Sequence, residues 1–331
     1  MQKIIDNPRL IYKCCKLYYE ENRGQQEIAD LLGVSRVSIS RMLQSGRELG
    51  LVKIQIVPPS HLTYTEMEKD LERLYGLKEA VVVENSPLAT AYDHLSELNA
   101  KAVGLLENYL HDNDVVGVSM GNTLHNVCNG TNSSVHTIKC TFVPIVGGIS
   151  SGRSATMNVH SNQTAMNFAR FFGGEYVEFF APAIFQDLAV LKGFMNEAPM
   201  QSVLQYYHKV KTVIMGIGTP NRAGSTMIRA GYITQEQLQE MVRQGVVGDL
   251  SLQFFDKDGN TDRFREFNAR VTGMPLRQLR KVENRICIGS GGHKAEAVHG
   301  AIRGGFINIL VTDQECAIKL IKMGKEEKEN E

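Results

Sequence analysis

Seven short apolar segments, spaced along the chain from residue 79 onward, set the strongest limit on how this sequence can fold. They are EAVVVE (79–84), DVVGVSM (114–120), TFVPIV (141–146), YVEFFAP (176–182), TVIMGIG (212–218), RICIGS (285–290) and FINILVTD (306–313). Strands buried on both faces of a parallel sheet read as such near-continuous runs of Val, Ile and Leu. Stretches with helical spacing separate most of them, which indicates an α/β fold. We therefore expect a doubly wound parallel sheet over residues 79–324.

The first 58 residues have a different pattern, which predicts three short helices. Asn7-Pro8 is typical of a helix start, and apolar side chains then recur at helical spacing at positions 10, 11, 14, 17 and 18. A second helix over Gln25–Leu32 would turn Ile28, Leu31 and Leu32 inward, and Gly33 permits the tight turn that follows. Ser35 would cap a third helix to about Glu48, whose apolar set is Val37, Ile39, Met42 and Leu43.

Two short helices around a glycine form the layout of a helix-turn-helix motif. LVKIQIV (51–57) alternates like a strand and could form a wing, so we expect a winged helix-turn-helix DNA-binding domain over residues 1–58. On such a helix arginine can bind guanine, glutamine can bind adenine, and hydroxyls can bind phosphates or base edges. The candidate DNA-binding residues are Gln25, Ser35, Arg36, Ser38, Ser40, Arg41 and Gln44. The alternative is a surface helix of a small bundle.

Charge and cysteine usage narrow the class of protein. The whole chain is neutral, with 36 basic and 36 acidic residues, yet residues 1–58 carry nine basic and six acidic ones, and no acid lies between Val34 and Arg47. Six cysteines without a CxxC pair indicate reduced thiols and a cytoplasmic location. No apolar run approaches the roughly 18 residues that cross a bilayer, and the N-terminus is unlike a signal peptide. We expect no membrane partner.

Two charged segments flank the larger domain. TYTEMEKDLERLY (63–75) predicts a helix within a linker at 59–78, which could join the domains, mediate dimerisation or pack on the next domain. KMGKEEKENE ends the chain, and we expect residues 325–331 to form a frayed charged tail.

Small-residue loops follow several of the predicted strands, namely VSMGNT, IVGGISSGRSATMNVHSNQT, MGIGTP and GSGGHK. Ligands bind beyond the carboxyl ends of the strands in an open parallel sheet, and glycines let backbone amides approach an anion at a helix N-terminus. Lys294 could pair with a phosphate, and Asp249 could accept hydrogen bonds from sugar hydroxyls. The longest loop adds Arg153, Asn158, His160, Ser161, Asn162 and Gln163. Four such loops in one domain favour a small-molecule site over tight packing alone.

The sequence gives little support to catalysis. Nothing fits GxxxxGK[ST], and no GxGxxG precedes a ribose-binding acid, which disfavours ATP and NAD. His293, Glu296 and His299 match no metal-site signature, so we expect no cofactor and no metal. A sugar-phosphate isomerase or aldolase with an appended helical domain is the alternative function, and His160 with Asp249 is its only plausible acid–base pair. A third possibility is a constitutive DNA-binding protein whose α/β domain only oligomerises.

Nearly end to end, the chain resembles the SorC family of bacterial sugar-binding transcriptional regulators. QQEIADLLGVSRVSISRMLQSGRELGLVKI is similar to that family's helix-turn-helix. YGLKEAVVV, DVVGVSMGNTL, PIVGGIS, GIGTP, GVVGDLSLQFFDKDG and GGHKAEAVHGAIRGGFINILVTDQECA are similar to its effector domain in order and spacing. Met120 stands where family members commonly have an aromatic residue, and the chain has no tryptophan.

The resemblance implies a winged-helix reader joined to a Rossmann-like domain that binds a phosphorylated sugar or polyol. It further implies a homo-oligomer, dimer or tetramer, on palindromic operator DNA. The implied effector-binding residues are Gly121, Asn122, Thr123, Gly148, Arg153, Asn158, His160, Ser161, Asn162, Gln163, Gly218, Thr219, Asp249 and Lys294. We therefore expect a regulator of carbohydrate metabolism genes, not an enzyme, whose operator affinity is controlled by a phosphorylated sugar.

Overall fold

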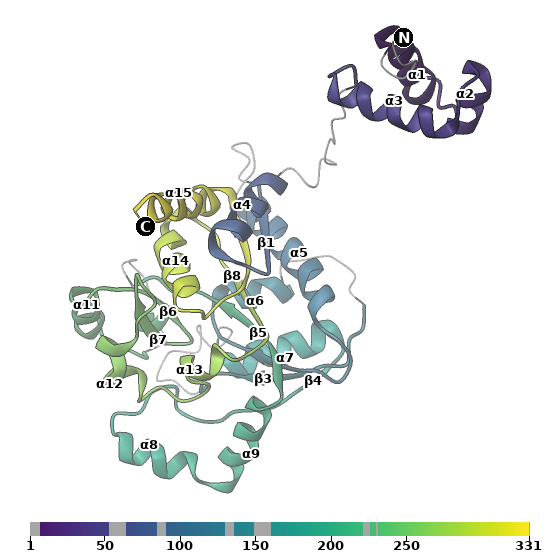
Figure 1. Ribbon diagram of the computed structural model, residues 1–331. Coiled ribbons are helices and arrows are strands. Elements are labelled where there is room, and N and C mark those ends of the chain that lie inside the picture. Colours follow the sequence, from purple (N-terminus) through teal and green to yellow (C-terminus); the bar gives the residue numbers. More distant parts are fainter. Residues whose placement is uncertain are drawn as a thin grey trace. The chain divides into compact units, whose positions relative to one another are not determined.

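The computed structural model describes residues 7–52, 64–84, 91–129, 136–148, 160–220, 226–229 and 231–330. The chain divides into two compact units, Met1–His61 and Leu62–Glu331 (Figure 1). Each unit is described on its own below.

The first unit is a bundle of three short helices, α1 (Pro8–Tyr19), α2 (Gln25–Leu32) and α3 (Arg36–Glu48). The side chains of Asn7 and Ser35 cap α1 and α3, and Gly33 ends α2 in the left-handed conformation at φ 65°. These are the predicted boundaries. The core contains Ile11, Cys14, Cys15, Leu17, Ile28, Ala29, Ile39, Met42 and Leu43, all buried.

Two side chains predicted to face this core are exposed instead. Leu31 is 55% exposed and Val37 is 63% exposed. Val37 lies two residues before the buried Ile39, and two residues along an α-helix turn the side chain about 200° to the far side. Of the predicted wing strand at 51–57, residues 53–57 lie outside the described residues, and Leu51 and Val52 carry no strand.

The second unit is built on a seven-stranded sheet in the order β1-β9-β8-β5-β2-β3-β4, with every neighbouring pair parallel. The strands are β1 (Glu79–Val83), β2 (Val115–Val118), β3 (Thr141–Pro144), β4 (Glu175–Tyr176), β5 (Val210–Gly216), β8 (Asn284–Ile288) and β9 (Ile309–Asp313). Helices pack on both faces, and the predicted doubly wound sheet is confirmed.

Alternate residues of the strands point to the two faces. On β5, Val213 and Met215 join one core cluster, whereas Ile214 joins the other. The first cluster is closed by α4 (Thr65–Tyr75), α14 (Ala295–Arg303) and α15 (Gln314–Asn330). The second is closed by α5 (Ala91–Tyr109), α6 (Asn122–Asn129) and α7 (Ser161–Phe172). Burial on both faces explains why the strands read as continuous apolar runs.

The charged segment 63–75 packs on this sheet as α4. It lies beside α15 and β1 (Figure 1). The carboxylates of Glu72 and Glu68 accept hydrogen bonds from the backbone N–H groups of Ala80 and Val82, at 3.0 and 2.9 Å. Because β1 is an edge strand, these carboxylates satisfy N–H groups that the sheet leaves unpaired. Of the three interpretations of this segment, packing on the next domain is therefore the one that the structure shows.

Two expectations for this unit are wrong, and one element was not predicted. The strand at 176–182 ends after Tyr176, since β4 is only two residues long. Residues 246–256, predicted only as a source of Asp249, form an antiparallel hairpin of β6 (Val246–Leu250) and β7 (Gln253–Asp256). The frayed tail at 325–331 is helical as far as Asn330, because α15 continues through it.

The remaining elements lie in the connections. They are α8 (Leu188–Met195), α9 (Ala198–Tyr207), α10 (Thr226–Arg229), α11 (Gln235–Arg243), η4 (Asp262–Phe264), α12 (Arg265–Asn268), α13 (Leu276–Leu279) and η5 (Gly292–Lys294). The β6–β7 hairpin packs with residues of α10, α11, η4 and α12 in a third buried cluster, which also contains Val146.

Candidate functional site

The topology of the sheet fixes one place where loops diverge. From β2 the chain proceeds outward to β3 and β4, whereas from β5 it proceeds the other way to β8 and β9, and β2 and β5 are neighbours. Loops leaving such a pair of strands turn away from each other and leave a crevice at their carboxyl ends, where open α/β sheets bind ligands. The predicted residues Gly121–Thr123 follow β2, and Gly218 and Thr219 follow β5. Both groups therefore flank the switch point.

Thr123 in the first turn of α6 lies against the ends of two other strands. A Cβ added to Gly216 would lie 3.7 Å from the Thr123 Cβ and 4.0 Å from the Ile288 carbonyl oxygen. Gly121 has φ 120°, a conformation that side chains rarely adopt, and its carbonyl accepts from the His125 N–H at 3.1 Å. The glycine thus lets the chain turn directly from β2 into α6, with the α6 N-terminus at the switch point.

Asp249 is joined to the loop after β5 by two backbone hydrogen bonds. The Gly218 N–H donates to the Asp249 carbonyl at 3.0 Å, and the Asp249 N–H donates to the Gly218 carbonyl at 3.1 Å. A side chain at Gly218 would collide with the Asp249 carboxylate, so glycine is required here by the close approach. The carboxylate is buried, 8% exposed, and accepts from the Leu252 N–H at 3.2 Å.

The charge of Asp249 is set by opposing effects. Burial raises the pKa of this carboxyl to about 6, and the Leu252 N–H and the Lys294 ammonium lower it again in part. Lys294 ends η5, and its Nζ lies 3.8 Å from the position of a Cβ added to Gly289 at the end of β8. The structure therefore brings Thr123, Gly218, Asp249 and Lys294 to the carboxyl ends of three adjacent strands.

The loop that carries Lys294 is shaped by a residue that the sequence analysis did not select. The Asp313 carboxylate, at the end of β9, accepts from the Gly291 N–H at 2.8 Å and from the Cys316 N–H at 3.0 Å. Gly291 has φ 95°. An acid as the last residue of a predicted strand was the available signal, because such residues lie at the ligand-binding edge.

The residues after β3 serve mainly to hold the backbone. The Ser161 hydroxyl donates to the Val146 carbonyl at 2.7 Å, and the Asn162 amide bonds both the N–H and the C=O of Phe179, at 2.8 and 3.2 Å. The Gln163 amide donates to Asn167 at 2.9 Å. A Cβ added to Gly148 would lie 2.6 Å from the Asn162 Nδ2.

His160 lies at the start of this helix, and its ring packs edge-on against Tyr232. The Nδ1 is 2.7 Å from the Tyr232 hydroxyl, and burial lowers the pKa of the imidazole. Arg153 and Asn158 lie outside the described residues. Thr219 is half-buried beside Gly218. Of the loop-149–163 residues, the structure therefore locates His160 to Gln163 on the β3 side of the crevice.

The tip of the β6–β7 hairpin reaches the end of β2. Ser251 and Leu252 both have positive φ, 50° and 67°, and the Ser251 hydroxyl is 2.8 Å from that of Ser119, which follows β2. Met120 packs with the cluster that contains Leu252. Two consecutive left-handed residues other than glycine are uncommon and tend to occur at functional sites. This hairpin forms one wall of the site.

In the first unit, α3 presents a polar face. Ser35, Arg36, Ser40, Arg41 and Gln44 are exposed, while Ser38 and Gln25 are half-exposed. Ser38 belongs to the helix cap, since its N–H and its hydroxyl both lie near the Ser35 hydroxyl, at 3.1 and 2.9 Å. The exposed Val37 lies on the same face as Arg41 and was missed as a candidate, although an apolar contact to the thymine methyl group is a known mode of base recognition.

Other chemistry has little basis in the described residues. All six cysteines are free, and burial raises the pKa of each thiol, to about 11 for Cys14 and Cys316. A search of the described residues for three or more His, Cys, Asp or Glu able to hold a metal ion found none. In the same part of the chain, no helix has both the length and the apolar character needed to span a bilayer.

Comparison with known proteins agrees with this geometry. The family model "Putative sugar-binding domain" matches residues 60–322, and that of the bacterial regulatory proteins of the crp family matches residues 24–52. The chain is 29% identical over 318 residues to the deoxyribonucleoside regulator of Bacillus subtilis, covering 96% of this chain and 98% of the relative. It is 29% identical over 320 residues to the sorbitol operon regulator of Klebsiella pneumoniae, covering 96% and 99%.

Solved structures give the same result. The crystal structure of the full-length sorbitol operon regulator SorC from Klebsiella pneumoniae superimposes with a TM-score of 0.72 at 28% identity, covering 95% of this chain and 98% of that one. A sugar-binding domain of a transcriptional repressor from Vibrio fischeri gives 0.70 at 25% identity, covering 79% and 99%.

A helix-turn-helix unit followed by a doubly wound domain, with a lysine and a buried acid at its switch point, defines a ligand-responsive DNA-binding regulator. The chain belongs to the SorC family of sugar-binding transcriptional regulators.

Proposed function

We propose that the effector is a phosphorylated sugar or polyol, bound at the carboxyl ends of β2, β5 and β8, and that it controls affinity for a palindromic operator. The regulator would act in the cytoplasm as a homo-oligomer, dimer or tetramer, and would catalyse no reaction. The names of two relatives, a sorbitol operon regulator and a deoxyribonucleoside regulator, support an effector with several hydroxyl groups.

The juxtaposition of Lys294 and Asp249 carries this proposal. An ammonium group at the end of η5 can neutralise a phosphate, while the N-terminus of α6 adds hydrogen-bond donors. Asp249 lies close enough to Lys294 to be influenced by its charge, and a buried carboxylate is an effective acceptor for sugar hydroxyls. One cation and one acceptor at neighbouring positions match a molecule with a phosphate at one end and hydroxyls along it.

The exposed face of α3 supports operator recognition. No hydrogen bond or ion pair between described residues engages the side chains of Arg36 and Arg41, so both are available to DNA. Gln44 is held by Glu48 through a hydrogen bond of 2.9 Å at the surface, which DNA can replace at small cost. Arg36, Val37, Ser40, Arg41 and Gln44 together would contact phosphates and base edges in the major groove.

The isomerase alternative finds no support in the described contacts. The ring of His160 is bonded to Tyr232, and the Asp249 carboxylate accepts from the Leu252 N–H. No described contact joins His160 to Asp249 as an acid–base pair would require.

The effector proposal is tested with a panel of sugar and polyol phosphates and their unphosphorylated parents, using thermal shift on the full chain. A ligand at about 100 times its Kd stabilises by about 2.7 kcal/mol, which raises Tm by several degrees. The shift is expected only with phosphorylated members and is lost in Lys294→Met. The matched control is Lys322→Met on the exposed surface of α15. A full response in Lys294→Met would place the phosphate elsewhere.

Operator binding is tested by selecting a duplex from a random-sequence pool and measuring fluorescence anisotropy over a range of salt concentrations. Arg36→Ala and Arg41→Ala are each expected to weaken binding. If the lost contact is to a base, discrimination between base pairs at one operator position should fall by about 1–3 kcal/mol. If it is to a phosphate, the slope of log K against log salt concentration should decrease by about one. Lys13→Ala, on the exposed surface of α1, is the control. Failure to select any duplex at low salt would refute DNA recognition.

A further inference from the structure

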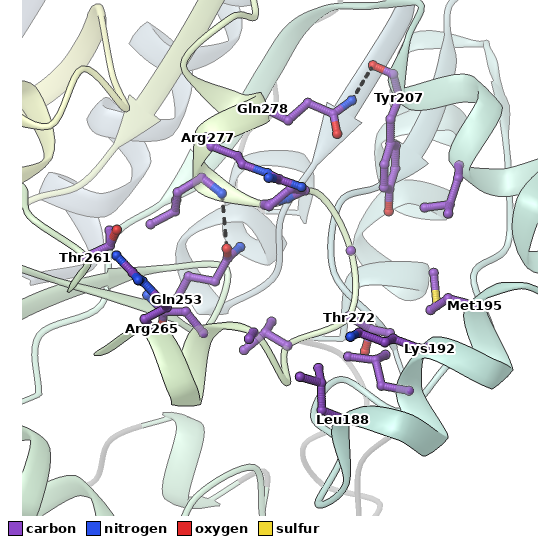
Figure 2. Close-up of a pocket in the computed structure, with 18 of the residues that line it drawn as sticks. Leu188, Lys192, Met195, Tyr207, Gln253, Thr261, Arg265, Thr272, Arg277 and Gln278 are labelled. Atoms are coloured by element: carbon purple, nitrogen blue, oxygen red, sulfur yellow. Dashed lines mark hydrogen bonds between the residues drawn. The ribbon is translucent and has the colours of Figure 1, made fainter. Parts of the chain in front are cut away.

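A second hollow in the larger unit is separate from the predicted effector residues. A cleft of about 700 Å³ opens between α8 and α9 on one side and β7, α12 and α13 on the other (Figure 2). None of the predicted effector-binding residues that the structure describes lines it. Its volume falls in the range of sites for small molecules.

The floor of this cleft is apolar. Leu188, Leu191, Met195, Leu204 and Leu276 contribute to its lining. Figure 2 shows Leu188 and Met195 on the helical side and the polar Gln253 on the opposite side.

The polar groups of the floor are already used within the fold. The Gln253 amide donates to the Met274 carbonyl at 2.9 Å and accepts from the Leu276 N–H at 3.1 Å. The Asn268 amide is bonded to both backbone groups of Phe254, at 2.8 and 2.9 Å. The hydroxyl groups of a sugar would have few hydrogen-bond partners at this floor, so the floor favours an apolar group.

The charge around the floor has one sign. Lys192, Arg265 and Arg277 line the cleft beside His208, and no Asp or Glu is among the lining residues that the structure describes. A smaller adjoining hollow of about 490 Å³ shares Tyr207, His208, Arg277 and Gln278 with it and adds Lys281. In a chain with equal numbers of basic and acidic residues, this one-sided charge is a local feature.

Two of these cations are available to a ligand. Arg265 is paired with Asp262 at 2.7 Å, but both side chains are more than three-quarters exposed and the pair is weak. Among the ion pairs of the described residues, none involves Lys192 or Arg277, which extend from α8 and α13 on opposite sides of the cleft (Figure 2). Both charges favour an anionic group in the cleft.

One wall of the cleft is the backbone segment that pairs with the start of the loop after β3, which leads into the predicted effector region. Val271, Thr272 and Gly273 form part of its wall. The Gly147 N–H donates to the Thr272 carbonyl at 3.2 Å, and Gly273 pairs with Val146. A molecule in the cleft therefore contacts the backbone segment that supports Gly148 from behind.

We propose that this cleft is a second ligand site, which binds an amphipathic anion: an unbranched acyl chain of about ten carbons that ends in a carboxylate. The chain would lie on the leucine floor, and the carboxylate would bind Arg277 and Lys192. In a sugar-responsive regulator such a site would report a second class of metabolite, the products of acyl-chain metabolism. That regulatory role rests on the proposed function, whereas binding itself does not.

Binding is tested by titration calorimetry of the full chain with decanoate, with decyl phosphate, 1-decanol and butyrate as comparison ligands. Decanoate is expected to bind with a Kd on the order of 10–100 µM. 1-Decanol and butyrate should bind at least tenfold more weakly, because 1-decanol lacks the carboxylate and butyrate lacks the long acyl chain. Decyl phosphate binding as tightly as decanoate would identify the source as a phosphate headgroup and overturn the carboxylate assignment.

Variants then locate the site. Arg277→Gln combined with Lys192→Gln is expected to weaken decanoate at least tenfold, and Leu188→Asn, on a side chain 39% exposed, to weaken it without lowering Tm. Lys257→Gln, exposed and outside the cleft, is the control. Unchanged decanoate affinity in both variants overturns the proposal. So does a change of oligomeric state in sedimentation without loss of decanoate binding, because the cleft would then be covered by a second copy of the chain. Sugar-phosphate thermal shifts in the same variants separate failure of this site from failure of the proposed effector site.

Discussion

At the scale of single residues, Asp249 shows how the fold prepares a side chain for binding. It is the one acid that the hairpin places against the loop after β5, and the cost of its burial is visible in a pKa raised to about 6. The protonated form is therefore favoured by folding. Stability is fully retained below the pKa of an unfolded aspartate, about 3.9, and is lost as the pH rises through about 6.

Asp249→Asn removes this titration and is expected to stabilise the protein at pH 7. The two proteins should have similar unfolding free energies near pH 4, with the variant gaining up to about 3 kcal/mol by pH 7. Urea unfolding from pH 4 to 8 measures the difference. Asp262→Asn, on a side chain 77% exposed, serves as the surface control. A constant difference for Asp249→Asn would mean that its carboxylate is not penalised by burial.

At the level of residues, candidates could be predicted from the sequence where chemistry and position coincide. Lys294 and Gly218 could be selected because each is a charged or small residue near the end of a predicted strand, and Asp249 because its carboxylate can accept hydrogen bonds from sugar hydroxyls. Asn162 could not be assigned correctly, because its amide replaces a strand partner for Phe179 and only the folded chain shows this. For the same reason the strand at 176–182 fails: the Val177 N–H still donates to the Phe142 carbonyl of β3 at 2.9 Å, but at Phe179 the backbone bonds the Asn162 side chain instead. Val37 was misassigned because apolarity alone was taken as burial.

At the scale of elements, the packing of α3 on α1 depends on the absence of a side chain. Gly46 is buried in α3, where glycine weakens a helix by about 1 kcal/mol relative to alanine. A Cβ added there would overlap the Cys15 Sγ on α1. From the sequence alone, Gly46 looks unfavourable within a helix. The residue whose contact requires it, Cys15, lies 31 positions away in the chain.

Gly46→Ala is therefore expected to destabilise the first unit by about 1–3 kcal/mol, the usual cost of an added methylene in a packed core, despite the better helix propensity of alanine. DNA affinity should fall in proportion to the unfolded fraction. Gly24→Ala, where an added Cβ meets nothing within 4 Å, is the matched control. Circular dichroism melting of the full chain with anisotropy on the selected duplex measures both effects. A stabilised Gly46→Ala variant would show that α1 and α3 are farther apart than described here.

The β6–β7 hairpin was missed for a reason of local chemistry. Its two-residue turn has positive φ at Ser251 and Leu252, whereas the sequence signals for such turns are Asn-Gly and Asp-Gly. Side chains hold the turn instead: the Ser119 hydroxyl, which lies outside the hairpin, and the Asp249 carboxylate, which belongs to β6. Sequence reasoning found the parallel sheet because burial on two faces leaves a strong pattern. It missed the hairpin because tertiary contacts overrule turn preference.

At the scale of the whole molecule, a chain of described contacts leads from the predicted effector residue Lys294 to α4, the helix nearest in sequence to the first unit. Lys294 directly precedes α14, and His299 in that helix lies 3.0 Å from the hydroxyl of Tyr75, the last residue of α4. The same hydroxyl donates to the Leu320 carbonyl at 2.7 Å, and the other His299 nitrogen faces Glu327 at 3.0 Å. A shift of α14 on effector binding would therefore be transmitted to α4 through the Tyr75 hydroxyl.

Thermodynamic linkage turns this arrangement into a quantitative prediction. If a sugar phosphate changes operator affinity by some factor, bound operator must change sugar-phosphate affinity by the same factor, about 5–150-fold in typical cases. Tyr75→Phe removes the hydroxyl that joins α4 to α14 and α15, so both factors should fall together toward one while each affinity measured alone stays within about twofold. Anisotropy with and without effector, and calorimetry with and without operator, supply the two factors. Tyr176→Phe, at an exposed position of β4, is the control. Equal coupling in wild type and Tyr75→Phe would show that the signal reaches the DNA-binding unit by another route. Unequal coupling factors within one protein would mean that DNA and effector do not act on the same two states.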